Sequence, residues 1–469
     1  MFKDKTRFKE LIAKYGHAVP RYTSYPTAPE WKQEFLQQDY ELALAKSNQS
    51  GKDYSLYLHI PFCESQCYYC GCNVVISPEH GIETKYIDQL KQELDYYASK
   101  VDMKRKVAQM AWGGGTPTYL SPEQIIDLMD FIKARFGLYT KASMAELAAA
   151  GVDYNEHEYA IEIDPRVTTR DHLQALYESG FNRLSMGIQD FNRQTQETIN
   201  RLQSFEQVAA LVATAREIGF TSINFDLIYG LPHQTIASFQ DTVMKVKQID
   251  PERIALFNYA HIPSIFPFQQ KYIDESTMPD QETKLEIFMS AVEELCDFGY
   301  DFIGIDHFAK ANDGLSLAQK SRTLSRNFQG YTTHAGLDLI ACGLSAISDV
   351  QGVYKQNPKK LNDYYENYLQ AEKFMVSSAD DKARREIIKE LMANNFAVID
   401  LNLYLDEFTA LRPFIEEGLL NWSYLDLTEP HKVRLEITEM GRFFARNIAS
   451  CFDAYISKEG AHRTFSKAL

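Results

Sequence analysis

From Tyr54 onward, short runs of β-branched and aromatic residues alternate with longer stretches whose apolar residues recur at helical spacing. The stretch Thr84–Val101, for example, places Ile87, Leu90 and Leu94 on one face of a helix. Strands that alternate with amphipathic helices in this way are typical of a parallel α/β sheet or barrel. The pattern therefore predicts an α/β fold.

The alternation yields six strand–helix units, which favours a partial (β/α)6 barrel over a full eightfold one. The predicted strands are Ser55–Ile60, Val107–Trp112, Tyr159–Asp164, Arg183–Ile188, Ser222–Ile228 and Arg253–Asn258. The predicted helices are Thr84–Val101, Pro122–Phe136, Phe205–Ile218, Ile236–Ile249 and Gln281–Phe298.

Changes in this alternation of strands and helices along the chain divide it into three predicted domains. Residues 1–50 contain three prolines and no long periodic segment, so we expect a partly extended N-terminal arm. Residues 51–370 hold the partial barrel and elements of the substrate site. Residues 371–469 are predicted to form a smaller, mainly helical and winged-helix-like domain. A further helix is expected as an insertion at Met144–Gly151.

Composition and charge narrow the classes of function. The 469 residues are 45% hydrophobic and 24% charged, as in ordinary globular proteins, with a net charge of -15 and a pI near 5.3. An acidic chain is a poor general nucleic-acid binder, since phosphate contacts need clustered Lys and Arg. We find no apolar stretch near the ~20 residues that a membrane helix needs, and no secretory signal, and we expect a cytoplasmic protein.

Four of the seven cysteines lie within ten residues, after the first predicted strand: Cys63, Cys67, Cys70 and Cys72. Three thiolates in one tight loop can hold three corners of an iron–sulfur cube and leave the fourth iron open. The alternative is structural zinc, which usually joins two short motifs separated by a dozen or more residues. The chain has no second motif of that kind, so the spacing favours an iron–sulfur cluster.

Polar and glycine residues mark the ends of the next strands. Gly113-Gly114-Gly115 would let a ligand approach the bare backbone, although a simple turn is the alternative. Glu162, Gln189 and Asp226 lie at or near the carboxyl ends of the third, fourth and fifth strands, which form the active face of parallel barrels. Three such polar groups within apolar runs favour a ligand site over the alternative, in which each is a core residue hydrogen-bonded within the protein.

The cysteine motif after the first barrel strand resembles that of the radical S-adenosylmethionine (SAM) enzymes. Five further segments resemble the oxygen-independent coproporphyrinogen III oxidase (dehydrogenase) family: Pro20-Arg21-Tyr22-Thr23-Ser24-Tyr25-Pro26-Thr27-Ala28, Trp112-Gly113-Gly114-Gly115-Thr116-Pro117-Thr118, Leu184-Ser185-Met186-Gly187-Ile188-Gln189-Asp190-Phe191, Asn224-Phe225-Asp226-Leu227-Ile228-Tyr229-Gly230-Leu231-Pro232 and Arg326-Asn327-Phe328-Gln329-Gly330-Tyr331-Thr332-Thr333. The similarity runs from the arm to about Tyr365 and continues toward the end of the chain. It implies the fold of a radical SAM barrel.

The resemblance also implies roles for individual residues. Cys63, Cys67 and Cys70 would ligate a [4Fe-4S] cluster, and Cys72 would not. Two SAM molecules are expected. The first would be bound by Tyr57, Gly114, Glu162 and Ile347. The second would be bound by Tyr69, Gly115, Thr116, Gln189, Arg201, Asp226 and Ala260. Gln329 and Arg21 are the expected catalytic residues.

The implied reaction turns two propionates of coproporphyrinogen III into vinyl groups, which gives protoporphyrinogen IX for haem biosynthesis. A 5′-deoxyadenosyl radical removes a hydrogen from the propionate β-carbon, and CO2 and one further electron then leave. The partners would be an electron donor such as flavodoxin or ferredoxin and an unknown acceptor, and the protein would be a monomer. Basic residues would meet the four propionates, each with a surface salt bridge as the alternative; the candidates are Arg21, Arg166, Arg183, Lys310 and Arg326.

Two other functions remain open at this point. A haem-binding chaperone of the same superfamily would share the barrel motifs, but it typically lacks the arm and the cysteine at position 72. A zinc-stabilised binding module would carry no catalysis, and metal analysis would identify it.

Overall fold

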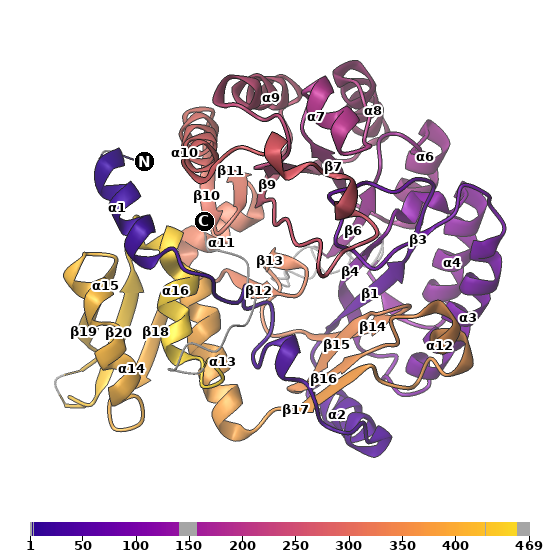
Figure 1. The fold of residues 1–469 in the computed structure, drawn as a ribbon. Coiled ribbons are helices and arrows are strands. Elements are labelled where there is room, and N and C mark those ends of the chain that lie inside the picture. Colours follow the sequence, from indigo (N-terminus) through magenta and orange to yellow (C-terminus); the bar gives the residue numbers. More distant parts are fainter. Residues whose placement is uncertain (1, 3, 140–156, 427, 457–469) are drawn as a thin grey trace. The chain divides into compact units, whose positions relative to one another are not determined.

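The computed structural model describes residues 2, 4–139, 157–426 and 428–456 (Figure 1). They divide into two compact units. The first, here called the barrel unit, comprises Lys32–Ile287 and Leu337–Val376. The second, here called the hairpin unit, comprises residues 1–31, 288–336 and 377–469. Each unit is assembled from separate stretches of chain, and the three predicted domain boundaries stay a prediction.

All six predicted barrel strands form, and neighbouring strands pair in parallel. In spatial order they are β1 (Tyr54–Ile60), β4 (Lys106–Gly114), β6 (Glu158–Ile163), β7 (Arg183–Gln189), β8 (Ser222–Tyr229) and β9 (Arg253–Asn258). The partial barrel is therefore confirmed. The sheet also continues on the other side of β1, which we did not predict, through β14 (Asp338–Cys342), β15 (Ile347–Val350), β16 (Val353–Gln356) and β17 (Lys373–Val376).

Residues on the barrel strands alternate between two faces. Leu184, Met186 and Ile188 of β7 are fully buried, whereas Ser185 and Gly187 between them are partly exposed. Because successive side chains of a strand point to opposite faces, one face packs apolar groups and the other presents polar ones. This alternation lets the same strands build a core and a polar site.

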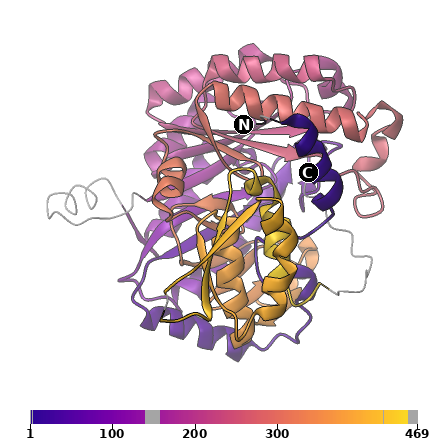
Figure 2. The same cartoon turned by 90° about the vertical axis from the view of Figure 1, so that its left-hand side faces the viewer.

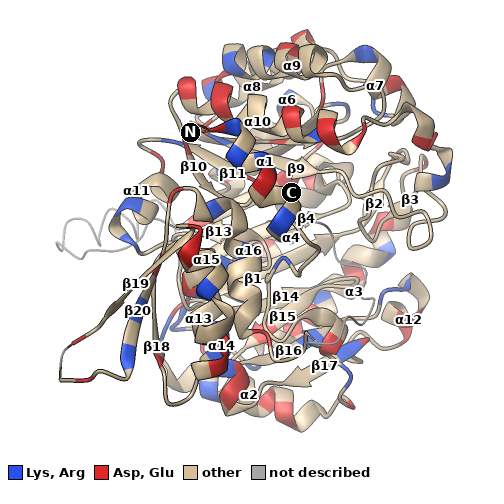
Figure 3. Ribbon diagram, turned by 60° about the vertical axis from the view of Figure 1, so that its left-hand side comes forward, with Lys and Arg blue, Asp and Glu red and all other residues tan. Residues whose placement is uncertain are grey.

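Helices follow the strands in the chain, and their charged residues of both signs contrast with the mostly uncharged strands (Figure 3). They are α3 (Ile82–Ala98), α4 (Pro122–Lys133), α6 (Arg170–Ser179), α7 (Arg193–Thr198), α8 (Phe205–Ile218), α9 (Ile236–Ile249) and α10 (Gln281–Asp297). As expected, α4 begins after Ser121, which accepts a hydrogen bond from the amide of Gln124. We did not predict α6, a ten-residue helix that begins at a capping box formed by Thr169 and His172.

The N-terminal arm is less extended than we predicted. It contains α1 (Lys5–Tyr15) and α2 (Gln37–Gln49). Asp4 caps α1, and Phe8 and Leu11 are buried on one face. This apolar repeat is short, and the periodicity of the sequence did not reveal it. The prolines of the arm lie between the two helices, where the chain is irregular.

The C-terminal part of the hairpin unit combines helices with a small antiparallel sheet (Figure 2). The predicted helix forms as α13 (Ala379–Met392), and the predicted strand as β20 (Lys432–Ile437). The remaining elements of this part are β18 (Phe396–Asp400), α14 (Leu405–Ala410), α15 (Arg412–Glu416), β19 (Leu420–Tyr424) and α16 (Ala445–Ala449). The sheet has the order β18-β20-β19, so this smaller, mainly helical part also contains three strands.

Two further strand pairs belong to the hairpin unit, namely β10 (Tyr300–Gly304) with β11 (His307–Lys310), and β12 (Ser325–Asn327) with β13 (Gly330–Thr332). The helix α11 (Gly314–Ser321) lies between them in the chain. The predicted inserted helix at Met144–Gly151 lies outside the described residues. Within the described ranges, we find no helix with the length and apolar character required to cross a membrane.

Candidate active site

Polar side chains gather at the carboxyl ends of the barrel strands. Glu162 of β6 accepts a hydrogen bond from the amide of Gly114 at the end of β4 over 3.1 Å. Asp226 of β8 accepts hydrogen bonds from Ser185 (3.3 Å) and Asn224 (2.8 Å). Gln189 ends β7 with a positive φ of 66° and is buried. The structure thus places the three predicted polar residues on adjacent strands at one edge of the sheet.

The two carboxyl groups influence each other. The pKa of Glu162 is raised to about 7, chiefly by desolvation and secondly by the nearby carboxylate of Asp226. Two carboxylates at one edge favour a positively charged ligand group, because such a group relieves the repulsion between them. The ammonium and sulfonium groups of SAM have this character.

The three glycines at the end of β4 are required by close packing, whatever ligand they meet. A Cβ on Gly113 would lie 2.8 Å from the carboxyl carbon of Glu162, and one on Gly115 would lie 2.6 Å from the carbonyl group of Pro61. Gly114 has a φ of +110°, which side chains disfavour. The sequence left ligand approach and a simple turn as alternatives; the structure adds a third reason for the glycines, and their contact with SAM stays a prediction.

The cysteine motif forms the loop that follows β1. Cys63 ends the short strand β2 (Phe62–Cys63), which pairs in parallel with β3 (Val75–Ile76), and its sulfur lies 3.4 Å from the hydroxyl oxygen of Thr116. The backbone amide of Cys72 donates to the sulfur of Cys70 over 3.4 Å. All seven cysteines are free thiols. Cys72 is exposed.

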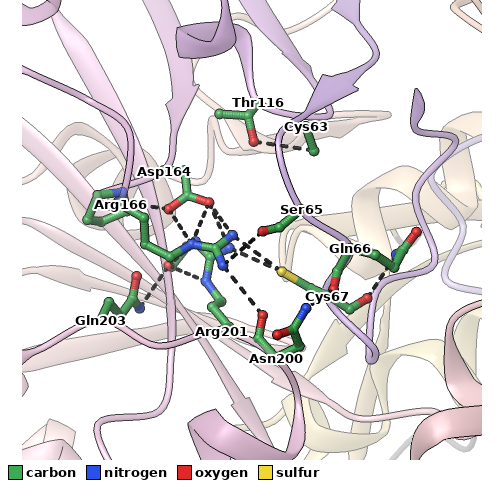
Figure 4. A network of polar contacts seen from close by, with 12 residues as sticks. Cys63, Ser65, Gln66, Cys67, Thr116, Asp164, Arg166, Asn200, Arg201 and Gln203 are labelled. Atoms are coloured by element: carbon green, nitrogen blue, oxygen red, sulfur yellow. Dashed lines mark hydrogen bonds and ion pairs between the residues drawn. The ribbon is translucent and has the colours of Figure 1, made fainter. Parts of the chain in front are cut away.

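The sulfur of Cys67 faces two guanidinium groups (Figure 4). Arg166 donates to it over 3.5 Å, and Arg201 donates over 3.6 Å. Both arginines also bind the Oδ2 atom of Asp164, at 2.7 and 3.0 Å. Burial alone would raise the pKa of Asp164, but Arg201 and Arg166 hold it at about 2. The carboxylate of Asp164 therefore holds both guanidinium groups beside the sulfur of Cys67, a predicted cluster ligand.

This donor set fits a thiolate-ligated iron–sulfur cluster. Such clusters are held by cysteine thiolates, each bound to its own iron, and hydrogen bonds to the sulfur atoms tune them. Cys63, Cys67 and Cys70 share one loop, and the two arginines supply the hydrogen bonds at Cys67. Across the described ranges, we find no group of three or more His, Cys, Asp or Glu side chains placed to hold a single metal ion.

A hydrogen-bonded chain ties the cysteine loop to β1. The Nε2 atom of His59 lies 3.0 Å from the carbonyl oxygen of Asn73, which can only accept. Nδ1 is then free to accept from the hydroxyl of Tyr57 at 3.3 Å. Burial lowers the pKa of His59 to about 4, so the imidazole is neutral at pH 7. Sequence reasoning assigned no role to His59 or Asn73, although His59 directly precedes the cysteine loop.

The remaining predicted SAM residues lie around this edge. Tyr69 packs beside an apolar cluster that includes Ile199 and Ile228. The side chain of Gln270 donates to the backbone oxygens of Tyr69 (3.4 Å) and Ala260 (3.2 Å) and thereby joins these two predicted residues. Sequence reasoning missed Gln270, because one glutamine in a loop carries no local signal.

Ile347 begins β15, next to β14, which pairs with β1 and sets Ala341 opposite Tyr57. Arg201 is buried and engaged with Asp164, the backbone oxygen of Gly187 (2.6 Å) and Cys67. The assignment of these residues to SAM stays a prediction.

The two predicted catalytic residues lie in the hairpin unit. Arg21 forms an ion pair with Asp306, which also contacts Nδ1 of His307. The ring of His307 lies edge-on to that of Tyr331, with ring centres 5.3 Å apart. Tyr331 belongs to β13, and Gln329 precedes that strand at the tip of the hairpin. The arm and the hairpin, more than 300 residues apart in the sequence, are thus joined by a chain of contacts.

The five basic candidates for substrate carboxylates differ in their partners. Arg166 pairs with Asp164, Arg183 with Glu158 at 2.8 Å, and Arg21 with Asp306. Lys310 ends β11. In the part of the chain that the structure describes, Arg326 forms no ion pair.

Comparisons with known proteins add a family context to this geometry. Residues 57–246 match the model of the Radical SAM superfamily. The oxygen-independent coproporphyrinogen III oxidase of Escherichia coli (strain K12) is 40% identical over 98% of this chain and 98% of its own. That of Synechocystis sp. (strain ATCC 27184 / PCC 6803 / Kazusa) is 40% identical over 98% of this chain and 97% of its own.

A solved structure is also similar. It is coproporphyrinogen III oxidase from Escherichia coli, described as a Radical SAM enzyme, and it is 38% identical in sequence. It matches with a TM-score of 0.83 over 94% of this chain and 100% of that chain. The likeness therefore extends over both units and is not confined to the barrel.

Proposed function

Because the chain belongs to the family of oxygen-independent coproporphyrinogen III oxidases, we propose that it converts coproporphyrinogen III to protoporphyrinogen IX without oxygen, in haem biosynthesis. The observation that carries this proposal is the cysteine loop at the carboxyl edge of the barrel, with two arginines directed at Cys67. Full-length similarity to named oxidases favours this function over a haem-binding chaperone.

Cys63, Cys67 and Cys70 would hold the [4Fe-4S] cluster as its three protein ligands. When bound, the cluster would supply an electron to SAM, and SAM would supply the radical that removes a hydrogen atom from a propionate. The protein's own residues bind, orient and shield these groups. Tyr57, Gly114, Glu162 and Ile347 bind the first SAM molecule.

A second SAM molecule is bound by Tyr69, Gly115, Thr116, Gln189, Arg201, Asp226 and Ala260. Gln270 positions two of these residues through their backbone oxygens. The carboxylates of Glu162 and Asp226 attract the cationic groups of SAM at neutral pH, where Glu162 is partly ionised.

Arg21 and Gln329 act on the substrate. Arg21 is held by Asp306, and a guanidinium so oriented can bind a propionate with its remaining N–H groups. Gln329 lies at a hairpin tip and offers both a donor and an acceptor. The product of each turn is a vinyl group and CO2.

The enzyme is a cytoplasmic monomer that receives electrons one at a time from a donor such as flavodoxin or ferredoxin. Seven free thiols support a reducing compartment. The acidic net charge of -15 supports neither nucleic acid nor a membrane surface as partner.

The decisive experiment is an anaerobic turnover assay with reconstituted protein, reductant, SAM and coproporphyrinogen III. Mass spectrometry of the porphyrins is the readout. The expected result is a product that has lost two CO2 units. Protein with an intact cluster and bound SAM that gives no decarboxylated product would reject the proposal.

Two variants sharpen this assay. Cys67→Ser is expected to abolish both the iron–sulfur absorbance and turnover. Cys296→Ser, which changes a thiol on α10 outside the motif, is the matched control and should retain both. Metal analysis of anaerobic protein tests the zinc alternative, which requires zinc and no acid-labile sulfide.

A further inference from the structure

The hairpin of β12 and β13 holds a buried arginine that has no counter-ion among the described residues. Arg326 is 6% exposed. Its Nε and Nη1 atoms are enclosed and have no hydrogen-bond partner in the described part of the chain. Nor does any described Asp or Glu form an ion pair with it. Three of the other four basic candidates, in contrast, each pair with a carboxylate.

Its surroundings add positive charge. The guanidinium of Arg326 lies over the ring of Tyr331, 4.8 Å from its centre. Burial raises the pKa of Tyr331, and the charges of Arg326, Arg21 and Arg442 oppose that rise, so three guanidinium groups lie near this phenol. The carboxylate of Asp306 contacts Arg21 and His307.

A buried charge is strongly unfavourable unless an opposite charge or hydrogen bonds compensate it. The aromatic ring of Tyr331 compensates only part of this cost. A buried polar group without a partner calls for an explanation, and a bound ligand that completes it is one. Nε and Nη1 lie on different edges of the guanidinium, and each can donate one hydrogen bond to a carboxylate oxygen, paired with Nη2 where the contact is bidentate.

We propose that Arg326 binds a propionate carboxylate of the substrate. This inference rests on the proposed function, because it names the substrate group that meets the hairpin. Gln329 lies at the tip of the same hairpin, so one element would both anchor the substrate and bear on its reaction. Because Nε and Nη1 are enclosed, binding must displace the atoms that cover them.

The test compares Arg326→Met, Arg326→Lys and the control Arg193→Met, which removes an exposed arginine on the surface of the barrel unit. Binding of coproporphyrin III, the stable oxidised form, is followed by fluorescence. Arg326→Met should weaken binding by about tenfold to a hundredfold, the equivalent of one charge-assisted hydrogen-bonded contact. Arg326→Lys should lie between, since it keeps the charge but loses the fork, and the control should bind as the wild type does.

Thermal unfolding without porphyrin separates this role from a structural one. Removing a buried, unpaired charge should leave the Tm of Arg326→Met unchanged or higher. A lower Tm together with wild-type porphyrin affinity would make Arg326 a structural arginine and overturn the inference. Amide hydrogen exchange of residues 325–332 should change when coproporphyrin III binds, and unchanged exchange would also count against it.

Failure of the inference and failure of the proposed function give different results. If the wild type decarboxylates coproporphyrinogen III and Arg326→Met shows wild-type KM and affinity, the carboxylate site is wrong and the oxidase stands. If the wild type binds coproporphyrin III through Arg326 but never yields a vinyl group, the carboxylate site stands and the oxidase is wrong.

Discussion

The guanidinium of Arg166 donates a hydrogen bond to the sulfur of Cys67 over 3.5 Å. The same guanidinium is clamped by the Oδ2 atom of Asp164 at 2.7 Å. A fixed cation beside a cluster ligand stabilises the more negative, reduced state of the cluster. The structure therefore points to electrostatic tuning at one of the three ligand positions.

Replacing Arg166 with Gln should lower the reduction potential of the reconstituted cluster. We expect a shift of about 60 mV, the equivalent of a tenfold change in a one-electron equilibrium. Redox titration followed by electron paramagnetic resonance measures it. Arg170→Gln, which removes a surface arginine paired with Glu217, is the control and should leave the potential unchanged. An unchanged or raised potential in Arg166→Gln would contradict the assigned role.

Glu162 should make SAM binding depend on pH. Desolvation, together with Asp226, raises its pKa to about 7, so the carboxylate forms as the pH rises through 7. Affinity for SAM should therefore increase between pH 6 and pH 8, by up to about tenfold for each pH unit below the pKa. Calorimetric titration of cluster-loaded protein tests this. Glu162→Gln should bind more weakly and lose the dependence, and a variant that keeps it would assign the titration elsewhere.

His59 should contribute to acid sensitivity. Burial depresses its pKa from 6.5 to about 4, so the folded protein excludes a proton that the unfolded chain binds. The free energy of unfolding should fall as the pH drops from 6.5 to 4, by about 3 kcal/mol from this residue. Urea unfolding at several pH values should show a shallower dependence for His59→Gln. His80→Gln, which changes an exposed histidine, should behave as the wild type does.

The buried Glu93 should be important for stability. It accepts hydrogen bonds from the Gly343 amide (2.8 Å), Asn357 (2.7 Å) and Tyr364 (2.7 Å), and it is fully buried near Lys355. Glu93→Ala leaves these donors and the cation unpaired, which should cost about 3–5 kcal/mol of unfolding free energy.

The paired change tests the cause of that loss. Glu93→Gln combined with Lys355→Met removes both charges and should unfold at a higher urea concentration than Glu93→Ala. Glu197→Ala, at the protein surface, is the control and should change stability little. Equal losses in the single and double variants would show that packing, and not charge, controls this site.

The sequence determined the strands of the barrel and the identity of the cluster loop. Apolar periodicity is a property of neighbouring residues, so β1, β4, β6, β7, β8 and β9 could be located without coordinates. Parallel strands end at one edge, which is why Glu162, Gln189 and Asp226 could be grouped in advance. The spacing of Cys63, Cys67 and Cys70 is equally local. Short elements such as α1 and α6 carry the same signal more weakly, and they were missed.

Only the tertiary structure decided which groups meet. Arg201 lies 37 residues from Asp164 and 134 from Cys67, and no local pattern connects them. Arg166 and Arg326 looked alike as basic candidates, yet within the described ranges Arg166 pairs with a carboxylate and Arg326 does not. A charge can be read from the chain, but its partner is set by the packing of distant segments. For that reason the chemistry of the loop was visible in the sequence, and its electrostatic setting was not.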